Sequence, residues 1–160
     1  MPLKLSSPLL AAAIVAAAVS SSASATVFVF DIPLIGAQEV LPNVGDPDGF
    51  GLAHLEIDDV TNTISWNITV GNIALPVAAA HIHQGAFGTN GPVRIDFSGQ
   101  LVGSNLFDAD LAGVLANPLN WYVNVHNAPH PGGAVRGQIP APGTLGLLAL
   151  AGPLVFRRRR

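Results

Sequence analysis

The chain has 160 residues, no cysteine and a formal net charge of −3 at pH 7, but its charges are unevenly spread. Residues 26–142 hold two basic and ten acidic residues, which gives this part a formal net charge of −8. A surface this acidic repels phosphate backbones and anionic lipid headgroups, which argues against nucleic acid as a partner. Without cysteine no disulfide can form, so core packing, alone or with a metal, must hold the fold.

The first 25 residues have the pattern of a signal peptide. A short start with Lys4 precedes an apolar run over residues 9–19, and the small residues Ala23 and Ala25 suit signal peptidase cleavage before Thr26. The alternative, a membrane helix, needs about 20 apolar residues, and this run is too short. The sequence therefore predicts an exported protein, with signal peptidase as a partner.

Residues 140–160 combine Pro140-Ala141-Pro142, an apolar segment over residues 145–156 and four terminal arginines. This order resembles the PEP-CTERM sorting signal of Gram-negative bacteria, in which an exosortase recognises Pro-Glu-Pro, an apolar helix and a basic end; here Ala141 replaces the glutamate. The resemblance implies processing by an exosortase-type enzyme at the inner membrane. A plain tail anchor is the alternative. Because the arginines would stay cytoplasmic, either interpretation places the middle of the chain beyond the inner membrane, in the envelope or outside the cell.

The middle of the chain, residues 26–139, is made of short alternating runs typical of β-strands. Strands are expected over residues 26–31, 34–40, 50–58, 63–70, 80–85, 93–97, 121–127 and 134–139. Pro33 is expected to end the first strand, and residues 108–116 form the one predicted helix. The predicted fold is an all-β Greek-key sandwich or barrel of about seven or eight antiparallel strands with one short helix. Apolar targeting helices are expected to flank it at both ends.

Two of the predicted strands carry the residues that could support chemistry. Because successive side chains of a strand point to opposite faces, His81 and His83 share one face, and Tyr122, Asn124 and His126 share another. With the apolar residues of both strands turned to the core, the three histidines would lie together on the outer face or at its rim. Three neutral imidazoles can bind zinc or copper, and the acidic surface favours a cation.

The histidines also have a purely structural interpretation. They could hydrogen-bond to the loops at residues 85–91 and 131–133 and hold these segments on the barrel, because buried polar groups need partners. His54 and His130 are expected at the surface, and Arg94 and Arg136 are expected to pair with acidic neighbours. The sequence has neither a Walker-type glycine loop nor Gly-x-Ser-x-Gly, so nothing supports a nucleotide-binding or serine-hydrolase function.

A set of motifs in the middle of the chain occurs in a specific order. They are Gly36-Ala37-Gln38-Glu39-Val40, His81-Ile82-His83-Gln84-Gly85, Gly91-Pro92-Val93, Trp121-Tyr122-Val123-Asn124-Val125-His126, Pro131-Gly132-Gly133 and Arg136-Gly137-Gln138-Ile139. This set resembles the CHRD domain, first recognised in chordin and found in many bacterial exported proteins. The resemblance implies a non-enzymatic binding or structural module of the cell envelope or extracellular matrix. Structural or binding roles are assigned to Tyr122, Asn124 and Arg136.

A weaker similarity is to copper/zinc superoxide dismutases, which share a His-x-His strand, a later strand ending in Val-His and a terminal arginine turn. It implies that His81, His83 and His126 match three copper ligands and Arg136 the arginine that guides an anionic substrate. No bridging histidine lies between His83 and Arg94, and no zinc subsite follows. The first interpretation is therefore the non-enzymatic module, and the alternative is a copper- or zinc-binding protein with these three histidines.

Overall fold

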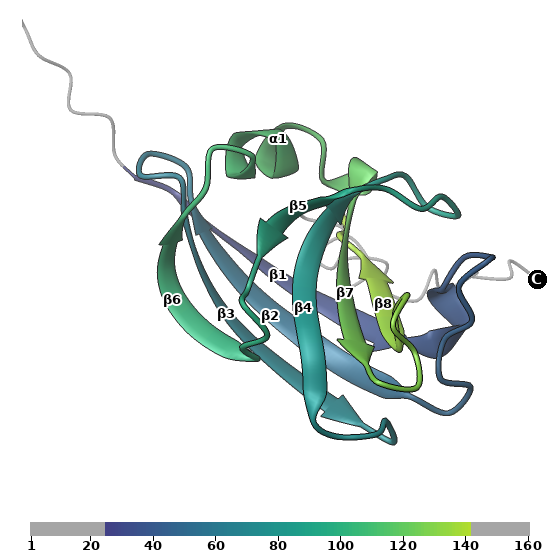
Figure 1. The fold of residues 1–160 in the computed structure, drawn as a ribbon. Coiled ribbons are helices and arrows are strands. Elements are labelled where there is room, and N and C mark those ends of the chain that lie inside the picture. The colour runs from purple at the N-terminus through teal and green to yellow at the C-terminus, as the bar shows by residue number, and fades with distance from the viewer. Residues whose placement is uncertain (1–24, 142–160) are drawn as a thin grey trace, which may run out of the picture.

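The computed structural model describes residues 25–141, which form one curled, half-barrel sheet of eight strands (Figure 1). The strands are β1 (Val27–Ile35), β2 (Phe50–Asp58), β3 (Thr63–Gly71), β4 (Val77–Gln84), β5 (Val93–Asp96), β6 (Val102–Phe107), β7 (Trp121–Asn127) and β8 (Val135–Gln138). Their order in the sheet is β5-β4-β7-β8-β1-β2-β3-β6, and every pair is antiparallel. The predicted fold class is confirmed, while the predicted targeting helices lie outside the described residues.

One short helix, α1 (Leu111–Ala116), lies at one end of the half-barrel, and two 3-10 turns, η1 (Gly36–Gln38) and η2 (Pro118–Asn120), complete the regular structure (Figure 1). The helix buries Leu111 and Val114 against the core. Within residues 25–141, no helix is long and apolar enough to cross a membrane.

The core fills the inside of the curl. In β2 the alternate residues Ala53, Leu55 and Ile57 are fully buried, and the residues between them face outward. The neighbouring strand β3 pairs with β2 in continuous register and contributes Ile64 and Trp66 to the same core. Each large apolar side chain buried in this way contributes about 1.5–3 kcal/mol of transfer free energy. The alternation of the sequence therefore places one face of this hairpin inside, as predicted.

Pro33 does not end the first strand, which is a correction to the sequence prediction. β1 runs through it, and Pro33 pairs with Leu52 of β2 in unbroken register. The carbonyl of Pro33 faces Gly137 of β8 rather than β2, so the missing N–H lies on the β8 side as well. Because β8 pairs with β1 only at Ile35 and Arg136, no ladder hydrogen bond is lost there.

The predicted strand over residues 34–40 is also wrong, and the strand β6 was not predicted. After Ile35 the chain forms η1 and enters a long loop to β2. β6 contains Gly103, Ser104 and Asn105, which have low strand propensity. It forms because Gly103 lies against the indole of Trp66, where a Cβ would collide, and because it pairs with β3 at the sheet edge.

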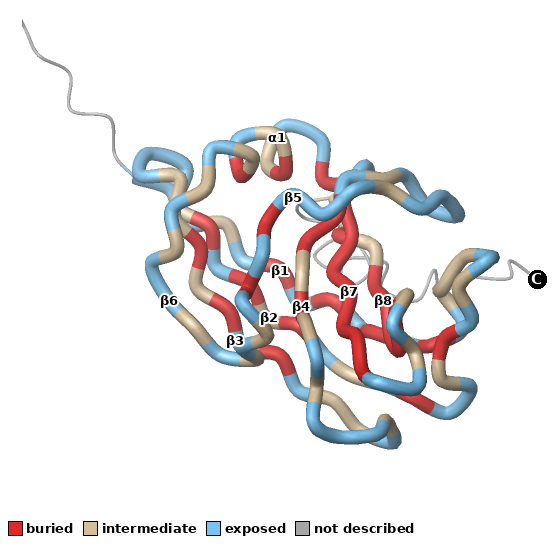
Figure 2. The backbone as a smooth tube through the Cα atoms, in the orientation of Figure 1, coloured by how far each residue is buried: buried red, intermediate tan, exposed pale blue. Residues whose placement is uncertain are grey.

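The strand β7 is buried on both of its faces. Figure 2 shows it red along its whole length, and all seven residues have little exposure. Trp121, Val123 and Val125 face the apolar core, while the other face is covered by three loops that connect β1 to β2, β4 to β5 and β7 to β8. The sheet therefore has a second, polar layer beneath these loops.

The three covering loops are bonded to one another. The Asn90 side chain donates to the carbonyl of Val40 at 2.9 Å, and that of Asn43 donates to the carbonyl of Gly132 at 3.1 Å. These bonds join the β4–β5 loop to the β1–β2 loop, and the β1–β2 loop to the β7–β8 loop. The polar layer is thereby shielded from water by a connected cover.

Candidate metal centre

Three histidines meet in the polar layer. In the register of β4 and β7, His81 lies opposite Asn124, His83 opposite Tyr122, and His126 opposite Ala79. One ring nitrogen from each histidine lies within 4.8 Å of the other two. They lie on the face of the sheet opposite the apolar core, but this face is not open to solvent, because the loops leave His83 and His126 only 7% and 8% exposed.

Two of the rings are oriented by backbone carbonyls. Nδ1 of His83 lies 3.0 Å from the carbonyl oxygen of Gly91, and Nδ1 of His126 lies 3.1 Å from that of Pro131. A carbonyl only accepts, so each Nδ1 must carry the proton and donate it. The Nε2 atom of both rings then keeps a free lone pair, and both Nε2 atoms are buried without a hydrogen-bond partner.

In His81 the nitrogen without a partner is Nδ1 rather than Nε2. Nε2 of His81 lies 3.5 Å from a carboxylate oxygen of Asp96 on β5, whereas Nδ1 is buried without a partner. The carboxylate favours a proton on Nε2 and leaves the lone pair on Nδ1. The cluster therefore offers two Nε2 lone pairs and one Nδ1 lone pair, each backed by a carbonyl or a carboxylate. Metal-binding histidines are usually oriented by such outer partners.

All three imidazoles are held neutral. Burial lowers the pKa of His83 to about 4, and the hydrogen bond to Gly91 opposes this shift only in part. Burial also lowers the pKa of His81 and of His126 below the usual 6.5. Since a metal binds the neutral ring, the cluster is in its metal-binding form at neutral pH.

The spacing of the nitrogens is close to that of a bound transition metal. Two nitrogens on one zinc ion, each about 2.0–2.1 Å from it, can be at most about 4 Å apart. The nitrogens of His81, His83 and His126 span up to 4.8 Å, so roughly 1 Å of closure would suffice. Three nitrogen ligands leave a further coordination position for water or another ligand.

A stack of side chains supports His83 from behind. The ring of Tyr122 lies parallel to His83, with centroids 4.8 Å apart, and the Arg136 guanidinium carbon lies 3.4 Å from the Tyr122 centroid. Arg136 is 1% exposed and donates to the carbonyl of Thr89 at 2.8 Å and that of Ala86 at 3.5 Å. The expected ion pair of Arg136 is therefore wrong, because among the described residues no carboxylate lies within ion-pair distance of it.

Of the remaining charged residues, Arg94 and His54 lie as expected, whereas His130 does not. Arg94 does approach an acid, with Nη1 3.9 Å from Asp110. His54 is exposed and lies 2.7 Å from Asp31. His130 is not a plain surface residue: its Nδ1 donates to the carbonyl of Val44 at 2.8 Å, which joins the β7–β8 loop to the β1–β2 loop.

Glu39 is a residue of the polar layer to which sequence reasoning assigned no role. Both of its carboxylate oxygens are buried without a hydrogen-bond partner, as is Oδ1 of Asn124. Burial raises the pKa of Glu39 to about 7, although the charge of Arg136 acts in the opposite direction. Only one feature of the sequence could have pointed to a role for Glu39. It lies in the motif Gly36 to Val40, within a mainly apolar loop segment.

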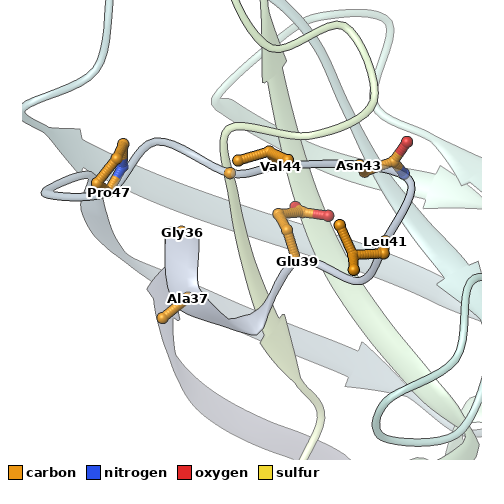
Figure 3. Close-up of a pocket in the computed structure, with 8 residues that line it drawn as sticks. Gly36, Ala37, Glu39, Leu41, Asn43, Val44 and Pro47 are labelled. Carbon is orange, nitrogen blue, oxygen red and sulfur yellow. The ribbon is translucent and has the colours of Figure 1, made fainter.

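A cavity of about 390 Å³ lies in the β1–β2 loop rather than at the histidines. Glu39 lines it together with Leu41 and Val44 (Figure 3). Its wall is mostly apolar, and it is open to solvent. Glu39 thus forms part of the wall of a solvent-open cavity, while its carboxylate oxygens remain buried.

Comparison with known proteins identifies the family. No curated protein and no solved structure matches the chain, so the similarity to superoxide dismutases stays a prediction. The CHRD domain family, in contrast, matches residues 30–139, which run from within β1 past the end of β8 and include all three histidines. The chain therefore belongs to the CHRD domain family.

Proposed function

We propose that this CHRD protein is an exported, non-enzymatic module that binds one transition-metal ion, zinc or copper, through His81, His83 and His126. One observation carries the proposal: the three histidines bring ring nitrogens within 4.8 Å of one another, and each ring keeps one buried nitrogen without a partner. A buried polar atom without a partner costs about 1–3 kcal/mol, and one shared ion would satisfy all three. The acidic surface would further favour a cation.

The structural and metal-binding interpretations are compatible, because an imidazole has two nitrogens. Nδ1 of His83 and of His126 fastens a covering loop, and Nε2 of the same ring remains available to an ion. Binding would therefore tighten the β4–β5 and β7–β8 loops around the site. A binding or structural module whose outer loops are stabilised by an ion fits a chain that has no disulfides.

Export is the second part of the proposal, and it rests on segments outside the described residues. The signal peptide at residues 1–25 would direct the chain through the inner membrane, and the sorting signal at residues 140–160 would hold it there until an exosortase-type enzyme acts. The motif begins at Pro140 and Ala141, directly after the last core residue Ile139. Processing there would leave the whole domain intact in the envelope or outside the cell.

The mature chain is expected to begin at Thr26, because Ala23 and Ala25 suit signal peptidase. β1 begins at Val27, so this cleavage would remove no core residue. Mass spectrometry of the N-terminal peptide of the exported protein measures the start directly. An exported chain that still carries Met1 would contradict the prediction.

The exported protein is expected to bind one zinc or copper ion per chain at pH 7, measured by elemental analysis after dialysis. His83 takes up a proton only near pH 4, well below the usual histidine range. At saturating metal, binding should therefore persist at pH 5.5 and be lost only once the pH falls below about 4.

His83→Asn is the informative variant for this measurement, and His54→Asn is its matched control. His54 is exposed and bonded to Asp31, away from the cluster, so its replacement should leave the metal content unchanged. His83→Asn should lose the ion. A wild-type protein without stoichiometric metal at pH 7, or a His83→Asn protein that keeps it, would refute the metal site.

A further inference from the structure

Glu39 is an enclosed acid at the edge of the histidine layer. Neither carboxylate oxygen has a partner at full hydrogen-bond geometry, although the side-chain amide of Asn124 lies close enough to act on the carboxylate as a donor. Two glycines of the covering loops make room for it: a Cβ at Gly133 would collide with Oε1, and one at Gly45 would lie 2.8 Å from Cγ. Gly133 has φ of +136°, a conformation that favours glycine. The carboxylate is thus packed in place, although an unpartnered buried charge is costly.

Few charges face Glu39 from the elements around it. Arg136 approaches from β8 and His130 from the β7–β8 loop, and both act against the rise in pKa that burial causes. The amide of Asn124 on β7 acts in the same direction. The net result is a pKa of about 7, so at neutral pH the group is divided between its protonated and ionised forms.

Two routes of contact join Glu39 to the three histidines. The first route leads through Asn124, which lies next to Glu39. Asn124 is directly opposite His81 in the sheet and two residues before His126 on the same face of β7. Through the second, Glu39 feels the charge of Arg136, which stacks on Tyr122 and so on His83. Along the first route, a single side chain, that of Asn124, therefore lies between the carboxylate of Glu39 and the histidines.

We propose that Glu39 is the charge-compensating acid of the metal site and releases its proton to solvent when a divalent cation binds. This inference rests on the proposed function. The three histidines bind as neutral rings and bring no negative charge, and Arg136 adds a positive one. The bound ion would therefore leave the layer strongly positive unless Glu39 ionises. The O–H bond of the carboxyl group breaks, the carboxylate stays, and the buffer takes up the proton.

Isothermal titration of the exported protein with zinc chloride tests this directly. Repeating it in buffers of different ionisation enthalpy at one pH gives the number of protons released per ion. With a pKa of about 7, Glu39 is about nine-tenths protonated at pH 6 and about one-tenth protonated at pH 8. If zinc binding lowers this pKa by about one unit, wild type should release about 0.4 proton more than Glu39→Gln at pH 6, and nearly the same number at pH 8.

The affinity supplies a second readout from the same titrations. At pH 8 the ionised Glu39 attracts the bound cation, so Glu39→Gln should bind zinc about tenfold more weakly than wild type if binding shifts the pKa by about one unit. Asp48→Asn is the matched control, since Asp48 is an exposed acid of the same loop. It should release as many protons as wild type and bind as tightly.

The outcomes separate this inference from the proposed function. Zinc binding with the extra proton release at pH 6 in wild type and Asp48→Asn, but not in Glu39→Gln, supports the charge-compensating role. Zinc binding with equal proton release in all three proteins overturns that role and leaves the metal site standing. No zinc binding by wild type overturns the metal site itself, and the role of Glu39 with it.

Discussion

Replacing Arg136 with methionine is expected to lower the free energy of unfolding by about 3 kcal/mol. The side chain is 1% exposed and is the largest among the fully buried ones. Its loss leaves the carbonyl of Thr89 without this donor and removes the cation that stacks on Tyr122 at 3.4 Å. The carbonyl of Ala86 loses only a long contact, because Thr89 still donates to it. The contacts with Thr89 and Ala86 hold the β4–β5 loop on Arg136, so this loop should loosen before the core does. Urea denaturation at pH 7 gives the free energy.

Arg94→Met is the matched control for Arg136→Met. Arg94 is 44% exposed in its side chain and lies 3.9 Å from an equally exposed Asp110, a pair that contributes less than about 1 kcal/mol. Arg136→Lys should rescue only part of the loss, because a lysine cannot reproduce the planar stack and its forked donors. Equal costs at Arg136 and Arg94 would mean that the buried stack does not stabilise the fold.

The alternation of apolar residues predicted the strands that have one buried and one exposed face. Leu55 and Ile57 lie in the core while Glu56 between them faces outward, and such a pattern can be recognised in the sequence alone. β6 has no such pattern, because it lies at the edge of the sheet and buries little. Its position depends on the fit of Gly103 beneath Trp66, which is a tertiary contact.

The same reasoning predicted part of the site. Alternation was enough to place His81 and His83 on one face, and His126 on the corresponding face of a second strand. Whether that face meets water depends on the path of the three loops, which carry no periodic signal. The burial of β7 on both sides was therefore not predicted, and neither was the isolation of Glu39 beneath the same loops.

The carbonyls that fix the rings could not be predicted for a related reason. Gly91 and Pro131 come from loops on either side of the site, and each presents a backbone oxygen at hydrogen-bond distance from an Nδ1 atom. Sequence gives residue types but not the direction of a loop carbonyl. These two carbonyls nevertheless decide which nitrogen of His83 and of His126 keeps its lone pair, and hence what the cluster can bind.

Adding a saturating metal ion is expected to stabilise the wild-type domain by about 4 kcal/mol when the free ion is at about a thousand times its dissociation constant. For a domain of this size such a gain raises the melting temperature by roughly 15 °C or more. The measurement is a thermal melt of each protein, once with a chelator and once with added zinc. Two replacements of the same histidine then separate the contributions of its two ring nitrogens.

The amide nitrogen of asparagine occupies nearly the position of Nδ1, so His83→Asn keeps a donor for the carbonyl of Gly91 but has no Nε2 lone pair. It should melt close to wild type with chelator and gain nothing from zinc. His83→Ala removes both nitrogens, so it should be about 1–3 kcal/mol less stable than wild type even with chelator, and zinc should not help it. A wild-type melting temperature that zinc does not change would refute the metal site, and the difference between the two variants would then measure the loop bond alone.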